Sequence, residues 1–236
     1  MKAIILAGGL GTRLSEETSD KPKPMVPIAG QPILWHLMNL ISKQGINDFI
    51  IAAGYKSDVI ASWVDQLECD WNVQTVDTGL ETQTGGRISI CMEKAEEEAV
   101  LVTYGDGLAN VNISELTKFH RSAGTLATIT AVRPPARFGV LHSENGIVKH
   151  FGEKNQADSG WINGGFFILE PGVKQFIEHT LEPFETGAIP RLVSQRQLAA
   201  YHHSGFWQPM DTLRERNDLE ILALQTTPPW LEGVAG

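Results

Sequence analysis

The sequence predicts an α/β fold in which a mixed, mainly parallel sheet is flanked by helices. Short apolar runs rich in β-branched residues, such as 2–7 and 49–54, are typical of strands buried on both faces. Apolar residues at helical spacing follow, as at 33–41. The order strand, helix, strand, helix within the first 67 residues indicates a Rossmann-like arrangement. Ligands are therefore expected in the loops at the carboxyl ends of the strands.

The first half of the chain alternates between expected strands and helices. Strands are expected at 2–7, 49–54, 72–76 and 99–103, and helices at 33–41, 57–67 and 88–98. Gly45 ends the first helix, and the hydroxyl of Ser57 can cap the second. A polar loop precedes the third helix, which is expected to end in the solvated acidic run 96–98.

The second half adds a hairpin to further strands and helices. We expect strands at 126–132, 161–169 and 198–202, a hairpin from 138–142 and 146–151, and helices at 112–124, 187–196 and 212–225. Asn112 and Glu115 resemble a capping box, and Pro171 opens a further helix. The mixed strand order indicates a smaller β subregion grafted on the sheet, so a single domain, 1–236, is expected.

The composition excludes several classes of partner. Of the 236 residues 42% are hydrophobic, and the net charge is −9. This acidic balance argues against nucleic acid or an anionic membrane as the partner. Cys69 and Cys91 lack metal-ligand or redox spacing, and no apolar run is long enough for a signal peptide or a membrane span. We therefore expect a cytoplasmic protein.

The most specific pattern lies in the first 27 residues. The glycine-rich stretch 8–12 lets backbone N–H groups surround an anion, and Arg13, Lys21 and Lys23 add positive charge. A phosphate chain is the ligand that needs all of these features. A Walker loop and a dinucleotide fingerprint are excluded, because the required lysine is absent after Gly11 and the third glycine is absent. The alternative is a surface loop whose cations offset nearby acids.

Two acidic residues stand where strands are expected to end. Asp106 follows an apolar strand and lies between two glycines, and Asp211 follows a second short strand. Mg²⁺ is normally held by one or two carboxylates together with substrate phosphates, so the pair suits this ion. The alternatives are a plain Asp-Gly turn at Asp106 and a helix N-cap at Asp211.

The motifs G-G-L-G-T-R-L at 8–14 and K-P-K-P-M at 21–25 resemble the signature of sugar-phosphate nucleotidylyltransferases. These enzymes join a nucleoside triphosphate to a sugar 1-phosphate, and their fold is that of nucleotide-diphospho-sugar transferases. Four further motifs resemble the glucose-1-phosphate cytidylyltransferase branch. They are T-G-G-R at 84–87, T-Y-G-D-G at 103–107, I-N-G-G-F-F at 162–167 and F-W-Q-P-M-D-T at 206–212. The match extends in order over nearly the whole chain.

The resemblance implies a role for each matching position. Arg13 and Lys23 are the expected catalytic residues, and Asp106 and Asp211 the expected Mg²⁺ ligands. The positions expected to bind the nucleotide are Leu6, Ala7, Gly8, Gly9, Leu10, Gly11, Thr12, Arg13, Lys23, Thr82, Arg87 and Asp106. Those expected to bind the sugar phosphate are Gly139, Glu153, Lys154 and Asn163. Residues 1–135 are thus mainly the nucleotide-binding part and 136–236 mainly the sugar-phosphate-binding part.

Some of these roles have alternatives. Arg87 can instead be a solvated arginine at the start of a helix, and Glu153 with Lys154 a surface ion pair. Trp207 is the aromatic residue to examine first as a platform for the sugar, because other aromatic residues in this half are more often found in a core.

The resemblance implies transfer of a cytidylyl group from CTP to glucose 1-phosphate, giving CDP-glucose and pyrophosphate, by a homo-oligomer. Two departures from the branch leave alternatives open. Few residues lie between Trp63 and Asn72, where the branch carries an insertion, and Asn155 stands where many relatives have proline. The alternatives are another sugar 1-phosphate or phosphorylated alcohol, UTP or dTTP as donor, and a non-catalytic nucleotide-binding subunit.

Overall fold

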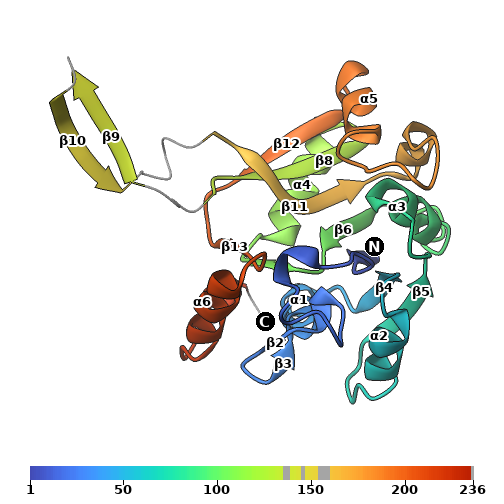
Figure 1. Ribbon diagram of the computed structural model, residues 1–236. Helices are drawn as coiled ribbons and strands as arrows, with labels where there is room; N and C mark the ends of the chain where they lie inside the picture. Colours follow the sequence, from blue (N-terminus) through green and yellow to red (C-terminus); the bar gives the residue numbers. More distant parts are fainter. Residues whose placement is uncertain (135–138, 145–146, 154–159, 235–236) are drawn as a thin grey trace.

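The computed structural model describes residues 1–134, 139–144, 147–153 and 160–234. A seven-stranded sheet runs through it in the order β12-β8-β11-β6-β1-β4-β5 (Figure 1). Its strands are β1 Ala3–Leu6, β4 Asp48–Ala53, β5 Asn72–Asp77, β6 Val100–Tyr104, β8 Ala127–Val132, β11 Ile162–Leu169 and β12 Leu198–His203. The neighbouring pairs are parallel except that β11 is antiparallel to both β6 and β8. The mixed, mainly parallel sheet predicted from the sequence is confirmed.

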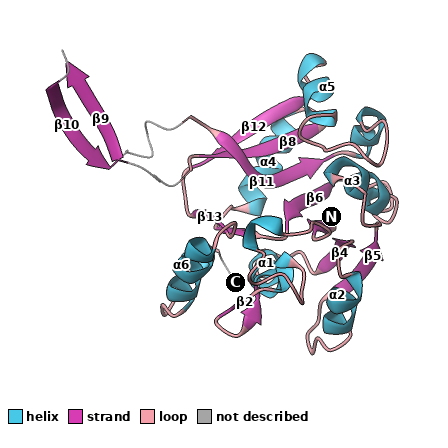
Figure 2. Cartoon of the chain, viewed as in Figure 1, coloured by secondary structure: helices cyan, strands magenta, loops and turns pink. Residues whose placement is uncertain are grey.

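Helices cover both faces of the sheet (Figure 2). The α-helices are α1 Ile33–Ser42, α2 Ser57–Val64, α3 Thr84–Met92, α4 Ile113–Ala123, α5 Ala188–Ser194 and α6 Leu213–Ala223. Side chains of α1, α2, α4 and α6 belong to one apolar cluster, and those of α3 and α5 to the other. Strand β1 contributes Ala3 and Ile5 to the first cluster and Ile4 and Leu6 to the second, because successive side chains of a strand point to opposite faces. None of the described helices is long and apolar enough to cross a membrane.

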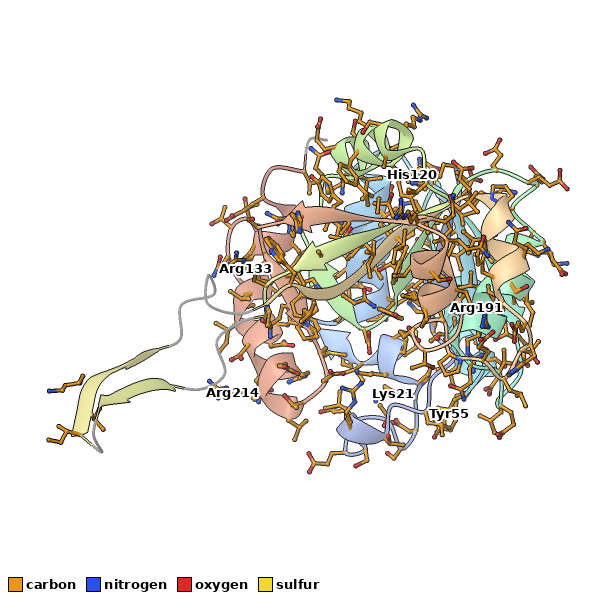
Figure 3. The ribbon with its side chains drawn as sticks, turned by 90° about the horizontal axis from the view of Figure 1, so that it is seen from above. Lys21, Tyr55, His120, Arg133, Arg191 and Arg214 are labelled. Carbon is orange, nitrogen blue, oxygen red and sulfur yellow. The ribbon has the colours of Figure 1, made fainter. Side chains whose placement is uncertain are left out.

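Short elements complete the fold around this sheet. They are the strands β2 Pro27–Ile28, β3 Gln31–Pro32, β7 Gly107–Ala109 and β13 Trp207–Pro209, and the 3-10 helices η1 Thr12–Leu14, η2 Lys23–Met25, η4 Pro171–Phe176 and η5 Pro229–Leu231. The expected hairpin is present as β9 Gly139–Glu144 and β10 Ile147–Glu153, which pair antiparallel. It stands apart from the sheet in both views (Figures 1 and 3). Pro171 opens a 3-10 helix, where the sequence had only predicted a helix start.

Helix α3 differs most from its prediction, because it begins at Thr84 and ends at Met92, before the acidic run. Two glycines in its first turn disfavour a helix locally. Tertiary contacts override this tendency, since the amides of Gln83 and Gly85 donate to the carbonyls of Thr180 and Glu182, both at 3.0 Å. A Cβ at Gly85 would lie 2.6 Å from the Glu182 carbonyl oxygen, so glycine permits this close approach.

Two helix caps also differ from the sequence predictions. Ser57 is the first residue of α2 and not its cap, because the N-cap is Lys56 in a left-handed conformation with φ 50°. The N-cap of α6 is Thr212, which forms a capping box with Glu215, so the alternative of Asp211 as the cap is wrong. By contrast, the side chain of Asn112 caps α4 by accepting from the amide of Glu115, as expected.

Candidate active site

A cavity of about 960 Å³ opens at the carboxyl ends of β1 and β6, where the first residues of the antiparallel strand β11 also lie. This is the edge of the sheet where α/β proteins bind ligands. The cavity is lined by Leu6, Ala7, Gly8, Gly9, Leu10, Gly11, Thr12, Arg13, Lys23, Pro24, Leu80, Thr82, Gln83, Thr84, Arg87, Thr103, Tyr104, Asp106, Gly107, Pro134, Ile162, Asn163, Gly164, Gly165, Phe166, Glu185, Trp207, Pro209 and Asp211. It therefore brings together every nucleotide-binding and metal-binding residue predicted from the sequence, together with Asn163.

Hydrogen bonds hold the glycine-rich loop after β1 in place on one side, and its other side faces the cavity. Gly11 has φ 64°, a conformation that glycine adopts readily. The hydroxyl of Thr18 donates to the carbonyls of Gly11 and Leu14, at 3.2 and 3.0 Å, and so fixes the turn that carries Arg13. A Cβ at Gly9 would meet no atom within 4 Å. Open space at Gly9 lets a ligand approach the backbone closely.

Arg87 is buried beneath this loop, so the alternative of a solvated arginine is wrong. Its guanidinium donates to the carbonyls of Gly8 and Ala53, both at 3.0 Å, and to the hydroxyl of Thr78. Burial lowers the pKa of the Arg87 guanidinium below its usual value. The guanidinium loses its hydration on burial, and its hydrogen bonds to these acceptors offset that loss. Arg87 therefore ties the glycine-rich loop to the end of β4, in addition to lining the cavity.

Replacing Arg87 by methionine is expected to lower the free energy of unfolding by about 1–3 kcal/mol, because buried acceptors lose their donor. We also expect weaker nucleotide binding, because the Gly8 carbonyl is no longer held. Urea denaturation and titration calorimetry with CTP measure the two effects. Arg121→Met, at an exposed position of α4, is the matched control and should change neither. Unchanged stability in Arg87→Met would contradict the role of Arg87 as an anchor.

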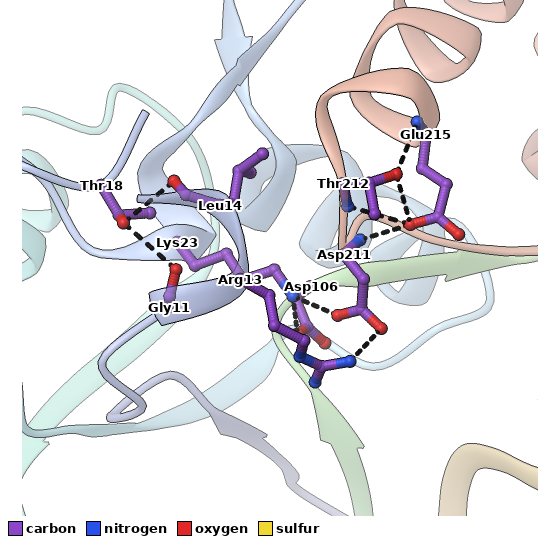
Figure 4. Close-up of polar contacts among 9 residues, drawn as sticks. All are labelled: Gly11, Arg13, Leu14, Thr18, Lys23, Asp106, Asp211, Thr212 and Glu215. Carbon is purple, nitrogen blue, oxygen red and sulfur yellow. Dashed lines mark hydrogen bonds and ion pairs between the residues drawn. The ribbon is translucent and has the colours of Figure 1, made fainter. Parts of the chain in front are cut away.

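The cations and carboxylates predicted from the sequence form one cluster (Figure 4). The ammonium of Lys23 lies 2.6 Å from Oδ2 of Asp106 and 2.6 Å from Oδ1 of Asp211. Nη1 of Arg13 lies 2.6 Å from Oδ2 of Asp211. The Lys23 side chain is only 8% exposed, whereas that of Arg13 is 72% exposed. Lys23 is thus held in place, whereas the exposed Arg13 side chain, although paired with Asp211, can be reached by a ligand.

The small β7–β13 ribbon brings the two aspartates together. Gly107 of β7 is paired with Pro209 of β13, and the amide of Met210 donates to the Asp106 carbonyl at 2.8 Å. The amide of Asp211 donates to Oε2 of Glu215 at 2.8 Å, within the capping region of α6. Since Thr212 provides the cap, the Asp211 carboxylate remains available to the cavity.

This pair of carboxylates fits a hard cation such as Mg²⁺. Both side chains offer oxygen donors, and a single ammonium lies between them, where a metal ion would neutralise the same charge. Over the described ranges, no group of three or more His, Cys, Asp or Glu side chains could hold a metal. A metal ion bound here would take these two carboxylates as its protein ligands, and substrate phosphate and water would have to complete its coordination.

The cavity lining also includes Glu185, a residue that could not be identified from the sequence. Glu185 accepts a hydrogen bond from Tyr104 and another from Oγ1 of Thr84, the latter at 2.7 Å. Nothing in the local sequence at 183–187 marks Glu185, since the loop only becomes part of the wall through packing on α3. Trp207, which was singled out from the sequence, lines the cavity and donates from Nε1 to the Gly164 carbonyl at 2.8 Å.

Other predicted residues are not placed in the cavity wall. Lys154 lies outside the described residues. Only the backbones of Gly139 and Glu153 are described, and they are paired across the β9–β10 hairpin. The sugar-phosphate roles of these three residues stay predictions. The ammonium of Lys21, which is labelled in Figure 3, lies 3.3 Å from Oδ1 of Asp20. This is the contact expected if Lys21 only offsets nearby acids on a surface loop.

Comparison with known proteins identifies the family of this chain. A family model described as nucleotidyl transferase matches residues 2–213. The chain belongs to the nucleotidyl transferase family. It is 46% identical to a glucose-1-phosphate cytidylyltransferase of Salmonella typhi, over 98% of both chains. It is 39% identical to a probable glucose-1-phosphate cytidylyltransferase of Bacillus subtilis, over 94% of both chains.

The fold of this nucleotidyl transferase is also similar to that of solved structures. HddC from Yersinia pseudotuberculosis is similar, with a TM-score of 0.72 and 26% identity, over 93% of this chain and 98% of HddC. The fold and family predicted from the sequence are confirmed. The alignment with the Salmonella protein spans 253 positions, more than the 236 residues of this nucleotidyl transferase, so the relative carries residues that it lacks. That the insertion lies between Trp63 and Asn72 stays a prediction from the sequence.

Proposed function

We propose that this protein transfers a cytidylyl group from CTP to α-D-glucose 1-phosphate, giving CDP-glucose and pyrophosphate. The observation that carries the proposal is the cluster of Lys23, Asp106 and Asp211 beside the glycine-rich loop. A triphosphate needs backbone donors, cations and a metal site at one place, and the proposal is supported by the glycine-rich loop, the two cations and the two carboxylates that line the cavity. The choice of cytosine and glucose is supported by the curated relatives at 46% and 39% identity.

In the proposed reaction an oxygen of the sugar phosphate attacks the α-phosphorus of CTP. The new P–O bond forms as the bond between the α-phosphorus and the bridging oxygen breaks, and the electron pair leaves with pyrophosphate. Both reactants are anionic, so the protein must mainly neutralise charge and align the groups. Lys23 provides a point charge near the α-phosphate, and Arg13 provides a planar fork for the outgoing phosphates.

The other residues predicted from the sequence are given the following roles. We propose that the loop from Leu6 to Thr12 surrounds the nucleotide, with Thr82 beside it, and that Arg87 holds that loop. Asp106 and Asp211 would hold Mg²⁺, which when bound neutralises phosphate charge and orients the triphosphate. Gly139, Glu153, Lys154 and Asn163 remain the proposed contacts for the sugar phosphate.

We also propose that the protein is a cytoplasmic homo-oligomer that binds neither nucleic acid nor membrane. The net charge of −9 argues against nucleic acid or an anionic membrane surface as a partner. The described cysteines, Cys69 and Cys91, are both free, as expected in a reducing compartment. Light scattering after size-exclusion chromatography measures the number of subunits, and a monomer would contradict the oligomer.

Pyrophosphate release tests the proposed reaction. With Mg²⁺ present, we expect release from CTP only when glucose 1-phosphate is added. A panel of CTP, UTP and dTTP against several sugar 1-phosphates and phosphorylated alcohols compares the alternatives. Release that is indifferent to the sugar phosphate would overturn the proposal, and faster release with another pair would replace CTP or glucose 1-phosphate.

A further inference from the structure

A carboxylate without a cationic partner stands in the wall of a cavity that otherwise fits a polyanion. Glu185 is half-buried and lines the cavity. Its Oε1 accepts from the Tyr104 hydroxyl, and its Oε2 accepts from Oγ1 of Thr84 at 2.7 Å. Among the described residues, no Lys, Arg or His forms an ion pair with Glu185. This differs from Asp106 and Asp211, which are both paired with Lys23.

The position of Glu185 is fixed by the loop that carries it. That loop docks on the first turn of α3, where the amides of Gln83 and Gly85 donate to the carbonyls of Thr180 and Glu182. The amide of Phe184 donates in turn to Oγ1 of Thr84 at 2.8 Å. Thr84 therefore accepts from the loop backbone and donates to the Glu185 carboxylate. A carboxylate held on both sides in this way is preorganised for a ligand.

Tyr104 connects Glu185 to the part of the cavity made by β11. Nδ2 of Asn163 donates to the Tyr104 hydroxyl oxygen at 3.3 Å, and that hydroxyl donates to Glu185. The Tyr104 hydroxyl thus accepts from Asn163 and donates to the carboxylate, so hydrogen bonds on two sides fix its orientation. The Glu185 oxygens have lone pairs left, because a carboxylate offers about four acceptor sites.

The negative charge of Glu185 decides which part of the substrate can bind beside it. A phosphate would be repelled by an unpaired carboxylate, whereas a neutral group with hydroxyl donors would gain charge-assisted hydrogen bonds. We propose that Glu185 is a specificity-determining residue that accepts hydrogen bonds from hydroxyl groups of the sugar, with Tyr104 holding it in place. The inference rests on the proposed function, because it names a sugar as the ligand.

An amino group on the base is the other donor that could reach a carboxylate. Position favours the sugar, since Glu185 is linked through Tyr104 to Asn163 of β11. The glycine-rich loop lies on the Arg87 side, where the guanidinium contacts the carbonyls of Gly8 and Leu80. The test therefore measures the two sources separately.

Glu185→Gln keeps the size of the side chain and removes its charge. We expect KM for glucose 1-phosphate to rise by about 10-fold or more, the scale of one hydrogen bond to a charged group. KM for CTP and the preference for CTP over UTP should stay within about twofold of the wild type, on the usual scatter for residues outside the contact. Glu178→Gln is the matched control, because its side chain lies in the same region of the chain and is 67% exposed.

Deoxyglucose 1-phosphates identify the hydroxyl. With the wild type, removal of the contacted hydroxyl should raise KM by a similar factor, and with Glu185→Gln the same removal should have little further effect. Non-additivity of this kind is the signature of a direct contact. The proposal would be overturned if removal of each sugar hydroxyl raised KM by the same factor in Glu185→Gln as in the wild type. An unchanged KM for glucose 1-phosphate in Glu185→Gln would also overturn it.

Two further outcomes are distinguishable. Loss of the preference for CTP with an unchanged KM for glucose 1-phosphate would assign Glu185 to the base and overturn the proposal. If Glu185→Gln does not fold, as judged by its thermal melting curve, Tyr104→Phe carries the same measurements, since it removes the hydroxyl that holds Glu185. A wild type that is inactive with glucose 1-phosphate overturns the proposed function instead, and the deoxy series is then made from whichever sugar phosphate the panel identifies.

Discussion

Replacing Lys23 by methionine is expected to lower the turnover of pyrophosphate release by at least about 10²-fold, the scale found for one preorganised charge donor. Lys23 is almost fully buried, and its ammonium is the charge that lies between the two carboxylates of the site. Methionine keeps much of the side-chain volume, so the effect on packing is small. Steady-state kinetics at saturating CTP and glucose 1-phosphate measures the loss.

A second measurement separates the effect of losing the Lys23 charge from the effect of changing its packing. In the absence of nucleotide the ammonium neutralises Asp106 and Asp211, so its removal should tighten the binding of Mn²⁺ alone, measured by calorimetry. Lys21→Met is the matched control, because Lys21 pairs with Asp20 and does not line the cavity in the described part of the chain. Near-normal turnover in Lys23→Met would discard the assigned role.

Asp106→Asn is expected to have the next largest effect, with lower turnover and a higher Mg²⁺ concentration for half-maximal rate. Asparagine keeps an oxygen donor but removes the charge that attracts the cation. Asp211→Asn should act in the same direction and should also release Arg13, which is paired with Asp211. Pyrophosphate release measured across a Mg²⁺ titration gives both quantities.

The control for this pair is Asp20→Asn, which removes an exposed carboxylate that does not line the cavity. It should leave the Mg²⁺ titration unchanged. An Asp106→Asn variant with wild-type turnover and an unaltered Mg²⁺ requirement would show that this carboxylate is not a metal ligand in the reaction.

The central strands could be predicted from the sequence because they are buried on both faces. In β1 every residue from Ala3 to Leu6 contributes to one of the two apolar clusters, so the whole run had to be apolar. The ions of the site could also be predicted, since Arg13 and Lys23 belong to local motifs at or just after the glycine-rich loop, and Asp106 and Asp211 stand close to strand ends. Short-range patterns of this kind are readable without tertiary contacts.

Features that depend on distant partners were not predictable in the same way. The first turn of α3 is helical because the backbone around Thr180 and Glu182 satisfies its amides, about 100 residues further along the chain. Arg87 was expected to be a ligand or a solvated side chain, yet its burial depends on the carbonyls of Gly8 and Ala53. Glu185 carries no motif at all, because only the docking of its loop places it in the cavity.

The two halves of the ion cluster come from opposite ends of the chain. Lys23 and Asp211 are 188 residues apart in sequence, and Asp211 is positioned only after the β7–β13 ribbon has formed. A nascent chain on the ribosome that has not yet reached β13 therefore has its phosphate loop but lacks the second carboxylate. Any premature stop codon before Asp211 yields a product that cannot assemble this pair of carboxylates, however well its early strands fold.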